Sequence, residues 1–207
     1  MSDAERAKLG LPKTFRVIAD HGTTQQLVFD PATKHFDRSF RASEPQFGDV
    51  EQAAAWLQAR RAAIITALTA IGDSQWAENL VLRGSVLLKA WLGEAAREPG
   101  DLDFVVAPAS WSIKNYRSQQ MLAGIAGRAQ RASAGSPVAV DADRAAIEGI
   151  WTYDRVPGLR MMLPWAADGG TPATCNWTSC STSTSPPPPN RPRSACPATG
   201  RPPWSWP

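Results

Sequence analysis

The last part of the sequence lacks the residues that build a hydrophobic core. From Thr171 to Pro207 there is no Leu, Ile, Val, Phe or Met, and no Asp, Glu or Lys. Such a segment cannot bury enough apolar surface to offset the entropy of ordering its backbone. We therefore expect residues 171–207 to form a disordered Pro/Ser/Thr-rich tail without regular secondary structure. The run Pro186 to Pro189 would also suit a ligand of proline-recognising domains.

Cysteine, long apolar runs and charge of one sign are also scarce. The three cysteines, Cys175, Cys180 and Cys196, are an odd number, and no His lies near them in the sequence, so neither a disulfide framework nor a zinc finger is expected. No apolar run approaches the length of a membrane span, and residues 1–13 hold no apolar signal-peptide segment. The net charge is +3, with Lys and Arg scattered, so the basic balance is no argument for nucleic-acid binding. We expect a cytoplasmic protein that does not contact a membrane.

The stretch from residue 80 to residue 106 is the most informative part of the chain. Leu80 to Leu82 is a short apolar run typical of a buried strand, and Gly84-Ser85 follows it. The next apolar residues have the spacing of an amphipathic helix: Val86, Leu87, Ala90 and Trp91. Pro99-Gly100 ends that helix, and residues 101–106 form a second strand.

Asp101 and Asp103 on this second strand point to a metal site. Side chains alternate along a strand, so the two carboxylates share one face and can hold a divalent cation such as magnesium between them. Ser85 lies where the start of a helix favours an anion. Each residue taken alone also fits a structural role: Asp101 capping a turn, Asp103 on a solvated face, Ser85 as an ordinary N-cap. Only the ordered combination favours a functional site.

The combination resembles the nucleotidyltransferase fold, specifically the AbiEii/AbiGii toxin family of bacterial toxin–antitoxin and phage abortive-infection systems. The resemblance rests on Leu82-Arg83-Gly84-Ser85, on Arg97 four residues before Asp101, and on Asp101-Leu102-Asp103. It covers about the middle third of the chain. The gap between Ser85 and Asp101 is near the long end for the wider superfamily.

The resemblance implies an enzyme that transfers a nucleoside monophosphate from a nucleoside triphosphate to a tRNA, protein or small-molecule acceptor. In its two-metal scheme, Asp101 and Asp103 are catalytic and bind both Mg²⁺ ions. Gly84 and Ser85 would hold the triphosphate, and Arg97 would contact phosphate or be an exposed structural residue. Lys89 is expected to be solvated rather than catalytic. The family also implies a cognate antitoxin. The alternatives are a non-catalytic remnant that binds nucleotide or antitoxin, and an antibiotic-modifying nucleotidyltransferase.

The predicted fold is α/β, a mixed sheet flanked by helices. Residues 1–48 form an N-terminal extension, loosely ordered to residue 20, with a possible hairpin of residues 26–29 and 34–40. Residues 49–170 form the nucleotidyltransferase-like core. The expected helices of this core are Val50 to Ile71, with Asp49 as N-cap, the helix that follows Ser85, and Ile113 to Arg131. Because a helix joins strands 80–82 and 101–106, we expect that pair to be parallel.

A second strand pair is expected later in the core. Residues 145–155 and 159–165 read as two strands joined by a hairpin turn at Val156-Pro157-Gly158. Asp168-Gly169-Gly170 is a further turn signal. This hairpin would add antiparallel strands, which makes the sheet mixed.

We favour a frameshift near residue 171 as the origin of the tail. The codons of Cys175-Asn176-Trp177-Thr178, read two nucleotides out of frame and excluding a stop, spell Gln-Leu-Asp. Nucleotidyltransferases of this fold have a third carboxylate on a neighbouring strand after the hairpin, where this hidden Asp falls. Asp168, in a Gly-rich turn, is a poor substitute. We therefore expect a truncated chain that lacks one strand and its third carboxylate, and is inactive.

Overall fold

We describe a computed structural model of the chain, which covers residues 3–18, 22–108, 110–112, 115–152, 156–167 and 173–181. Its helices are α1 (Asp3–Lys8), α2 (Val50–Gly72), α3 (Gly84–Leu92) and α4 (Tyr116–Ala132), with 3₁₀ turns η1 (Pro31–Thr33), η2 (Ala77–Asn79) and η3 (Gly93–Ala95). Its strands are β1 (Thr23–Thr24), β2 (Leu27–Phe29), β3 (Phe40–Ala42), β4 (Gln46–Phe47), β5 (Leu80–Arg83), β6 (Asp101–Val106), β7 (Val138–Val140), β8 (Ala146–Thr152), β9 (Val156–Ala167) and β10 (Ala173–Ser181).

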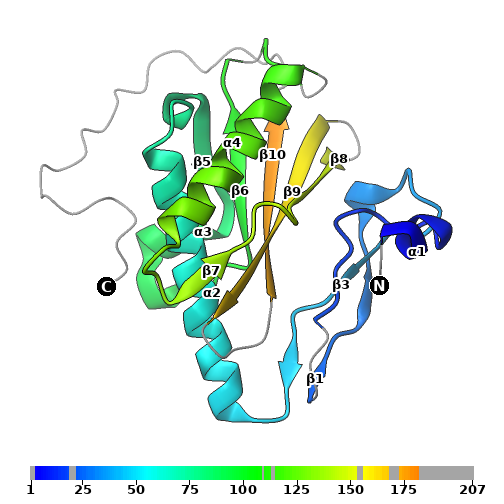
Figure 1. Ribbon diagram of the computed structural model, residues 1–207, viewed down its shortest axis with the longest axis vertical. Helices are drawn as coiled ribbons and strands as arrows, with labels where there is room; N and C mark the ends of the chain where they lie inside the picture. Colours follow the sequence, from blue (N-terminus) through cyan, green and yellow to red (C-terminus); the bar gives the residue numbers. More distant parts are fainter. Residues whose placement is uncertain are drawn as a thin grey trace, which may run out of the picture.

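One mixed sheet forms the centre of the molecule. Its strand order is β5-β6-β10-β9-β7, and β8 also pairs with β9. The β6–β10 pair is parallel, whereas the other pairs are antiparallel. Figure 1 shows α2, α3 and α4 on one side of this sheet, and the N-terminal segment (residues 3–18 and 22–48), which includes α1, on the other. A mixed sheet flanked by helices is the α/β architecture predicted from the sequence, and it is confirmed.

The predicted parallel pairing of β5 and β6 is wrong. The two strands are antiparallel, with Arg83 opposite Asp103 and Leu80 opposite Val106. Helix α3 has nine residues and is therefore about 13 Å long, but residues 93–100 lead the chain back again. The connection therefore returns to the end of the sheet at which β5 finishes, and β6 starts beside that end. It is not a crossover to the opposite end of the sheet.

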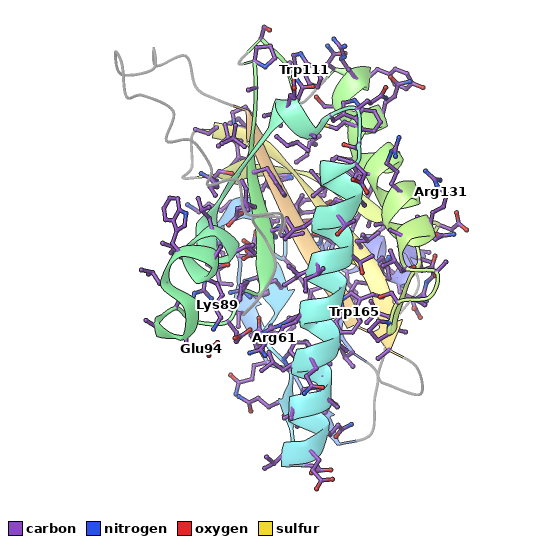
Figure 2. The ribbon with its side chains drawn as sticks, turned by 90° about the vertical axis from the view of Figure 1, so that its left-hand side faces the viewer. Arg61, Lys89, Glu94, Trp111, Arg131 and Trp165 are labelled. Atoms are coloured by element: carbon purple, nitrogen blue, oxygen red, sulfur yellow. The ribbon has the colours of Figure 1, made fainter. Side chains whose placement is uncertain are left out.

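The hydrophobic core lies between the sheet and helices α2 and α4. Asp49 is the N-cap of α2, as predicted, and its carboxylate accepts a hydrogen bond from Glu51 N at 2.9 Å. Met121, Leu122 and Ile125 of α4 are fully buried. They pack among residues of α2 and of the sheet that include Ile64, Leu102 and Phe104. In Figure 2, α2 runs across the sheet, with Trp165 labelled beside it.

Two local predictions differ from the structure, and one strand was not predicted. Residues 3–8 form helix α1 in the region expected to be loosely ordered. Val156, Pro157 and Gly158 belong to strand β9 rather than to the hairpin turn, since Thr152 already pairs with Val156. Residues 153–155, between β8 and β9, lie outside the described residues, as do Asp168, Gly169 and Gly170. Strand β7 was not predicted.

The expected loss of a strand in the tail is also wrong. Residues 173–181 form β10, which pairs with β6 on one side and β9 on the other, in the middle of the sheet. The two neighbouring strands supply backbone hydrogen-bond partners along both edges of β10, which outweighs its lack of aliphatic residues. The rest of the predicted tail, residues 182–207, lies outside the described residues.

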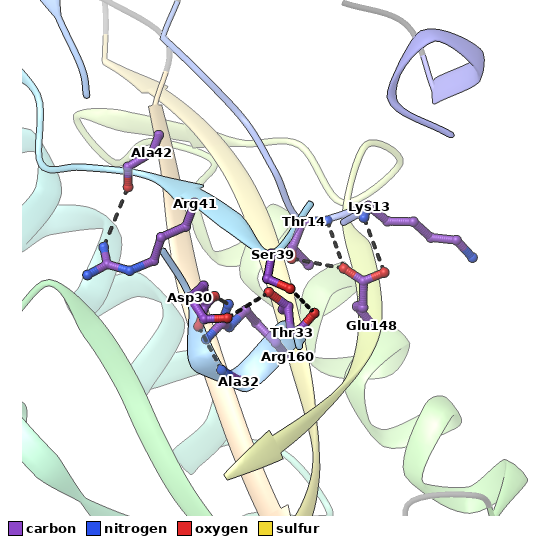
Figure 3. Close-up of polar contacts among 10 residues, drawn as sticks. All are labelled: Lys13, Thr14, Asp30, Ala32, Thr33, Ser39, Arg41, Ala42, Glu148 and Arg160. Carbon is purple, nitrogen blue, oxygen red and sulfur yellow. Dashed lines mark hydrogen bonds and ion pairs between the residues drawn. The ribbon is translucent and has the colours of Figure 1, made fainter. Parts of the chain in front are cut away.

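The N-terminal segment is attached to the sheet by polar contacts (Figure 3). The Glu148 carboxylate on β8 accepts hydrogen bonds from Lys13 N, Thr14 N and Thr14 Oγ1 at 3.1–3.3 Å. Arg160 on β9 forms an ion pair with Asp30. Within the segment, β2 pairs antiparallel with β3, and β1 with β4. These contacts hold residues of the segment over the sheet face opposite to α2 and α4.

Candidate active site

Asp101 and Asp103 occupy alternate positions of β6. The burial pattern of this strand also alternates: the two Asp residues are partly exposed, while Leu102 and Phe104 are almost completely buried beneath the helices. The carboxylates therefore share the face that the N-terminal segment covers farther along the sheet. This is the arrangement expected from their spacing of two.

Gly84 brings the end of β5 into close contact with Asp103. Its φ of +78° is a conformation that favours glycine, and a Cβ at this position would lie 2.5 Å from Asp103 Oδ2. The backbone of the turn can approach the carboxylate only because residue 84 has no side chain. The structure thus places the predicted Gly84 and Asp103 against each other.

Ser85 follows in the first turn of α3 and is buried. Its Oγ has no hydrogen-bond partner among the described residues. No side chain in the described structure caps the start of α3. A helix start leaves backbone N–H groups without intrahelical partners and carries partial positive charge, so an oxyanion would satisfy both features. Phosphate is an oxyanion of this kind.

The electrostatics of Asp103 fit a cation beside it. Burial raises the pKa of Asp103 above its usual value, and the negative charge of Asp101 raises it further. Arg83, Arg160 and Arg97 act in the opposite direction. Two carboxylates that repel each other on one face are stabilised in their ionised form by a divalent cation, which takes oxygen ligands. The residues present therefore fit a cation bound by two carboxylates.

A third carboxylate is absent from the described part of the site. Thr178 of β10 lies in register with Asp103, and Asn176 with Asp101. Residues paired in register project from the same face, so an acid at position 178 would adjoin Asp103. Within the described residues, no three His, Cys, Asp or Glu side chains are placed to hold a metal ion together.

Lys89 is not solvated, contrary to prediction. Its side chain is only 2% exposed, and its Nζ lies 3.0 Å from Glu98 Oε1 and 3.3 Å from Glu94 Oε1. Glu98 also accepts two hydrogen bonds from Arg61 of α2, at 2.6 and 2.9 Å. Figure 2 shows Lys89, Glu94 and Arg61 gathered beside α3. This network joins α3, the connection from α3 to β6 (residues 93–100, called the return segment) and α2. It thereby fixes the helix that carries Ser85.

Hydrogen bonds from Arg61 and Lys89 lower the pKa of Glu98 to about 2. Burial acts against this effect, so the charge of Glu98 depends on its two basic partners. Arg97, one residue earlier, is exposed. Its positive charge lowers the pKa of Asp103, less than Arg83 and Arg160 do.

Two residues beside the site, Arg83 and Arg160, were not predicted from the sequence as site residues. Arg83 lies opposite Asp103 in the β5–β6 ladder. Arg160 lies opposite Thr178, two strands away from Asp103. Arg83 belongs to the motif Leu82-Arg83-Gly84-Ser85, so its position near the site could have been predicted from the sequence. Arg160 had no such signal, because its place depends on the register of three strands.

Comparison with known families identifies this arrangement. The model of the nucleotidyl transferase AbiEii toxin family, of type IV toxin–antitoxin systems, matches residues 66–198, more than half of the chain. The chain belongs to the AbiEii family. The match includes β5, α3, β6 and the strands from β7 to β10, and is thus wider than the stretch that suggested the family. No curated protein matches the chain.

The AbiEii match begins within α2 and leaves out the N-terminal segment. The described helices of the chain include none with the length and apolar character needed to span a membrane. The family accounts for a nucleotidyl transferase domain, and its type IV systems pair a toxin with an antitoxin.

Proposed function

We propose that this AbiEii chain binds a nucleoside triphosphate with Mg²⁺ at the Gly84–Asp103 site, and that transfer of the nucleoside monophosphate is strongly impaired. The observation that carries the proposal is the contact of Gly84 with Asp103 beside the buried, unpartnered Ser85 Oγ. This contact supports a phosphate cradle facing a carboxylate pair. The toxin family also favours this reading over the antibiotic-modifying alternative.

Each residue has a defined part in the proposal. Ser85 and the first N–H groups of α3 hold phosphate oxygens of the nucleotide, and Arg97 adds positive charge from the surface. Asp101 and Asp103 hold the cation and stay ionised in its presence. When bound, Mg²⁺ would neutralise charge on the phosphates and lower the pKa of an acceptor hydroxyl.

The impairment follows from position 178. A third carboxylate would complete the cation ligands and accept a proton from the acceptor hydroxyl. Thr178 occupies the register position beside Asp103 and has no carboxylate to do so. The out-of-frame Gln-Leu-Asp places its acid at this same position, so a frameshift remains our explanation for its loss. A nucleotide-binding, non-catalytic domain is the second candidate function, favoured by the same observation.

The acceptor would be a tRNA, a protein or a small molecule, and an antitoxin would be the cognate partner. The test measures two quantities on the 207-residue chain: binding of each labelled nucleoside triphosphate with Mg²⁺, and transfer of label to total RNA and protein. We expect binding that Asp103→Asn abolishes, and little or no transfer. Transfer at the rate of the Thr178→Asp variant would refute the impairment, and the absence of binding for every nucleotide would refute the site.

A further inference from the structure

A cleft lies between the N-terminal segment and the sheet, beside the carboxylate pair. It has an empty volume of about 810 Å³, including the part open to solvent. Its walls come from residues 14–18 and 40–45 of the N-terminal segment, from α2 and from Arg160 of β9. Gly100, the residue before Asp101, also lines it. Most of this wall precedes residue 66 and so lies outside the region that matches the AbiEii family.

The cleft carries more positive than negative charge. Four arginines and two acids line it: Arg16, Arg41, Arg60 and Arg160, against Asp30 and Glu44. Arg41 is exposed, and its Nη1 lies 3.5 Å from the Ala42 carbonyl oxygen, the contact drawn in Figure 3. Arginine presents a planar fork of donors that matches phosphate oxygens, so a surplus of arginine favours a phosphate-bearing ligand.

Arg60 is incompletely partnered in this cleft. Its side chain is 10% exposed and stacks over Trp56, with the guanidinium carbon 4.5 Å from the ring centroid. Its ion-pair partner, Glu44, is 65% exposed. The buried Nε of Arg60 has no hydrogen-bond partner among the described residues. A buried cation is thus compensated by a carboxylate that can turn into water, and a ligand phosphate can take the place of that carboxylate.

The cleft lies on the side of the carboxylates that faces away from Ser85. Arg160 is in register with Thr178, which is in register with Asp103, so its backbone is about 10 Å from that of Asp103. In phosphoryl transfer the attacking and leaving groups lie roughly in line, on opposite sides of phosphorus. With the triphosphate held at α3, the acceptor approaches from the β10 and β9 side.

We propose that this cleft binds a phosphate group of the acceptor, with Arg41 and Arg60 as its phosphate-binding residues and Glu44 as the carboxylate that the phosphate displaces. The identity of the bound molecule as the acceptor rests on the proposed function. The binding itself does not, because it needs neither Mg²⁺ nor the triphosphate. The phosphate belongs either to a polynucleotide or to a small phosphorylated molecule.

The test measures binding of a fluorescein-labelled single-stranded RNA oligonucleotide by anisotropy, with AMP as an unlabelled competitor. Arg41→Gln should weaken RNA binding about tenfold and reduce the slope of log affinity against log salt by about 0.7. Glu44→Gln should strengthen binding about two- to fivefold, because Arg60 is released. The matched controls Arg38→Gln and Glu78→Gln remove exposed charges outside the cleft and should leave affinity unchanged.

Competition by AMP would identify a single phosphate as the recognised group, whereas RNA binding without competition by AMP would identify a polynucleotide. Either result supports the proposed phosphate site if Arg41→Gln weakens RNA binding and Glu44→Gln strengthens it. Effects of Arg41→Gln and Glu44→Gln no larger than those of the controls, or no binding of either probe, would overturn the proposal. Asp103→Asn separates the two sites, because RNA binding at the cleft should be unchanged in this variant. If RNA binding is unchanged and the wild type binds no nucleoside triphosphate, only the proposed function is refuted.

Discussion

The two strands that flank β6 contribute very different chemistry to the same face of the sheet. On one side, β5 and α3 bring Gly84 against Asp103, and the buried Ser85 follows Gly84 in the first turn of α3. On the other, residues 176–181 of β10 pair with the whole of β6, and Asn176 and Thr178 are in register with the two acids. The first flank supplies a close backbone contact and a buried hydroxyl, whereas the second supplies backbone pairing without a carboxylate. Strand pairing therefore does not establish that a site is complete.

Strand β10 can form without the family's side-chain chemistry because its stability comes from its position. It lies between β6 and β9, so its backbone groups have partners on both edges. Its sequence also contains Thr and Trp, which are favoured in strands. Sequence changes that preserve strand propensity can therefore remove a catalytic carboxylate and leave the sheet intact.

The largest expected effect is on the intact flank, from Gly84→Ala. The new Cβ would overlap Asp103 Oδ2 at 2.5 Å, and the φ of +78° is unfavourable for alanine. Asp103 or the turn must move, so nucleotide affinity should fall about a hundredfold, the change that about 2.7 kcal/mol produces. Isothermal titration with a non-hydrolysable nucleoside triphosphate and Mg²⁺ measures it.

Gly135→Ala is the matched control for this substitution. Its φ is +81°, but a Cβ there would meet nothing within 4 Å. It should therefore cost about 1 kcal/mol of unfolding free energy through the backbone alone and leave nucleotide affinity unchanged. Equal losses of affinity in the two variants would mean that Gly84 acts through its backbone conformation and not through contact with Asp103.

The altered flank is tested by Thr178→Asp, the next largest effect. An acid in register with Asp103 adds a ligand for the cation, so Mg²⁺ affinity should rise about tenfold, and nucleotidyl transfer should become measurable. Ser179→Asp is the control, because Ser179 is in register with the buried residues Phe104 and Leu159, where a charge is unfavourable. If Thr178→Asp leaves Mg²⁺ affinity unchanged, β10 does not face the metal site in the way proposed.

The same contrast explains what could be predicted from the sequence. Period-two spacing placed Asp101 and Asp103 on one face, and Gly-Ser before a helix placed Ser85 correctly, because these features depend on residues close in sequence. The antiparallel pairing of β5 with β6 and the formation of β10 depend on which strands meet in space. Composition argued against β10, since this strand contains no Leu, Ile, Val, Phe or Met. Composition carries no information on the backbone hydrogen bonds that β6 and β9 supply.

Burial of Lys89 was missed for a related reason. The position of Lys89 in α3 suggested a solvated side chain. Its partner Glu98 lies outside that helix, and the return segment brings Glu98 to Lys89. An ion pair between elements leaves no periodic signal. Arg160 was missed likewise, since its position beside the site follows from strand register.

Glu98→Gln should have a smaller effect, on the thermal stability of the chain, because Glu98 holds α3 through its ion pair with Lys89. The pKa of Glu98 is lowered to about 2, so its ionised form stabilises the fold above its ordinary pKa near 4.5, and this stabilisation is lost as pH falls toward 2. At pH 7 the substitution should lower Tm by about 2–4 °C, the shift that about 1 kcal/mol produces in a domain of this size. The difference in Tm from wild type should disappear near pH 2.

The smallest expected effect concerns Asp103, which both flanks adjoin, and it has the opposite sign. Burial and Asp101 raise the pKa of Asp103, so the folded chain binds more protons there than the unfolded chain does. The free energy of unfolding should therefore fall as pH rises from the ordinary Asp pKa, near 4, through the raised value. Asp103→Asn removes this slope, which urea unfolding across pH 4 to 7 measures. In wild type, Mg²⁺ should restore stability above the raised pKa by favouring the ionised carboxylate, and in Asp103→Asn it should not. A stability that rises with pH in wild type relative to Asp103→Asn would mean that Arg83, Arg160 and Arg97 outweigh burial, and that the site holds its charge without a cation.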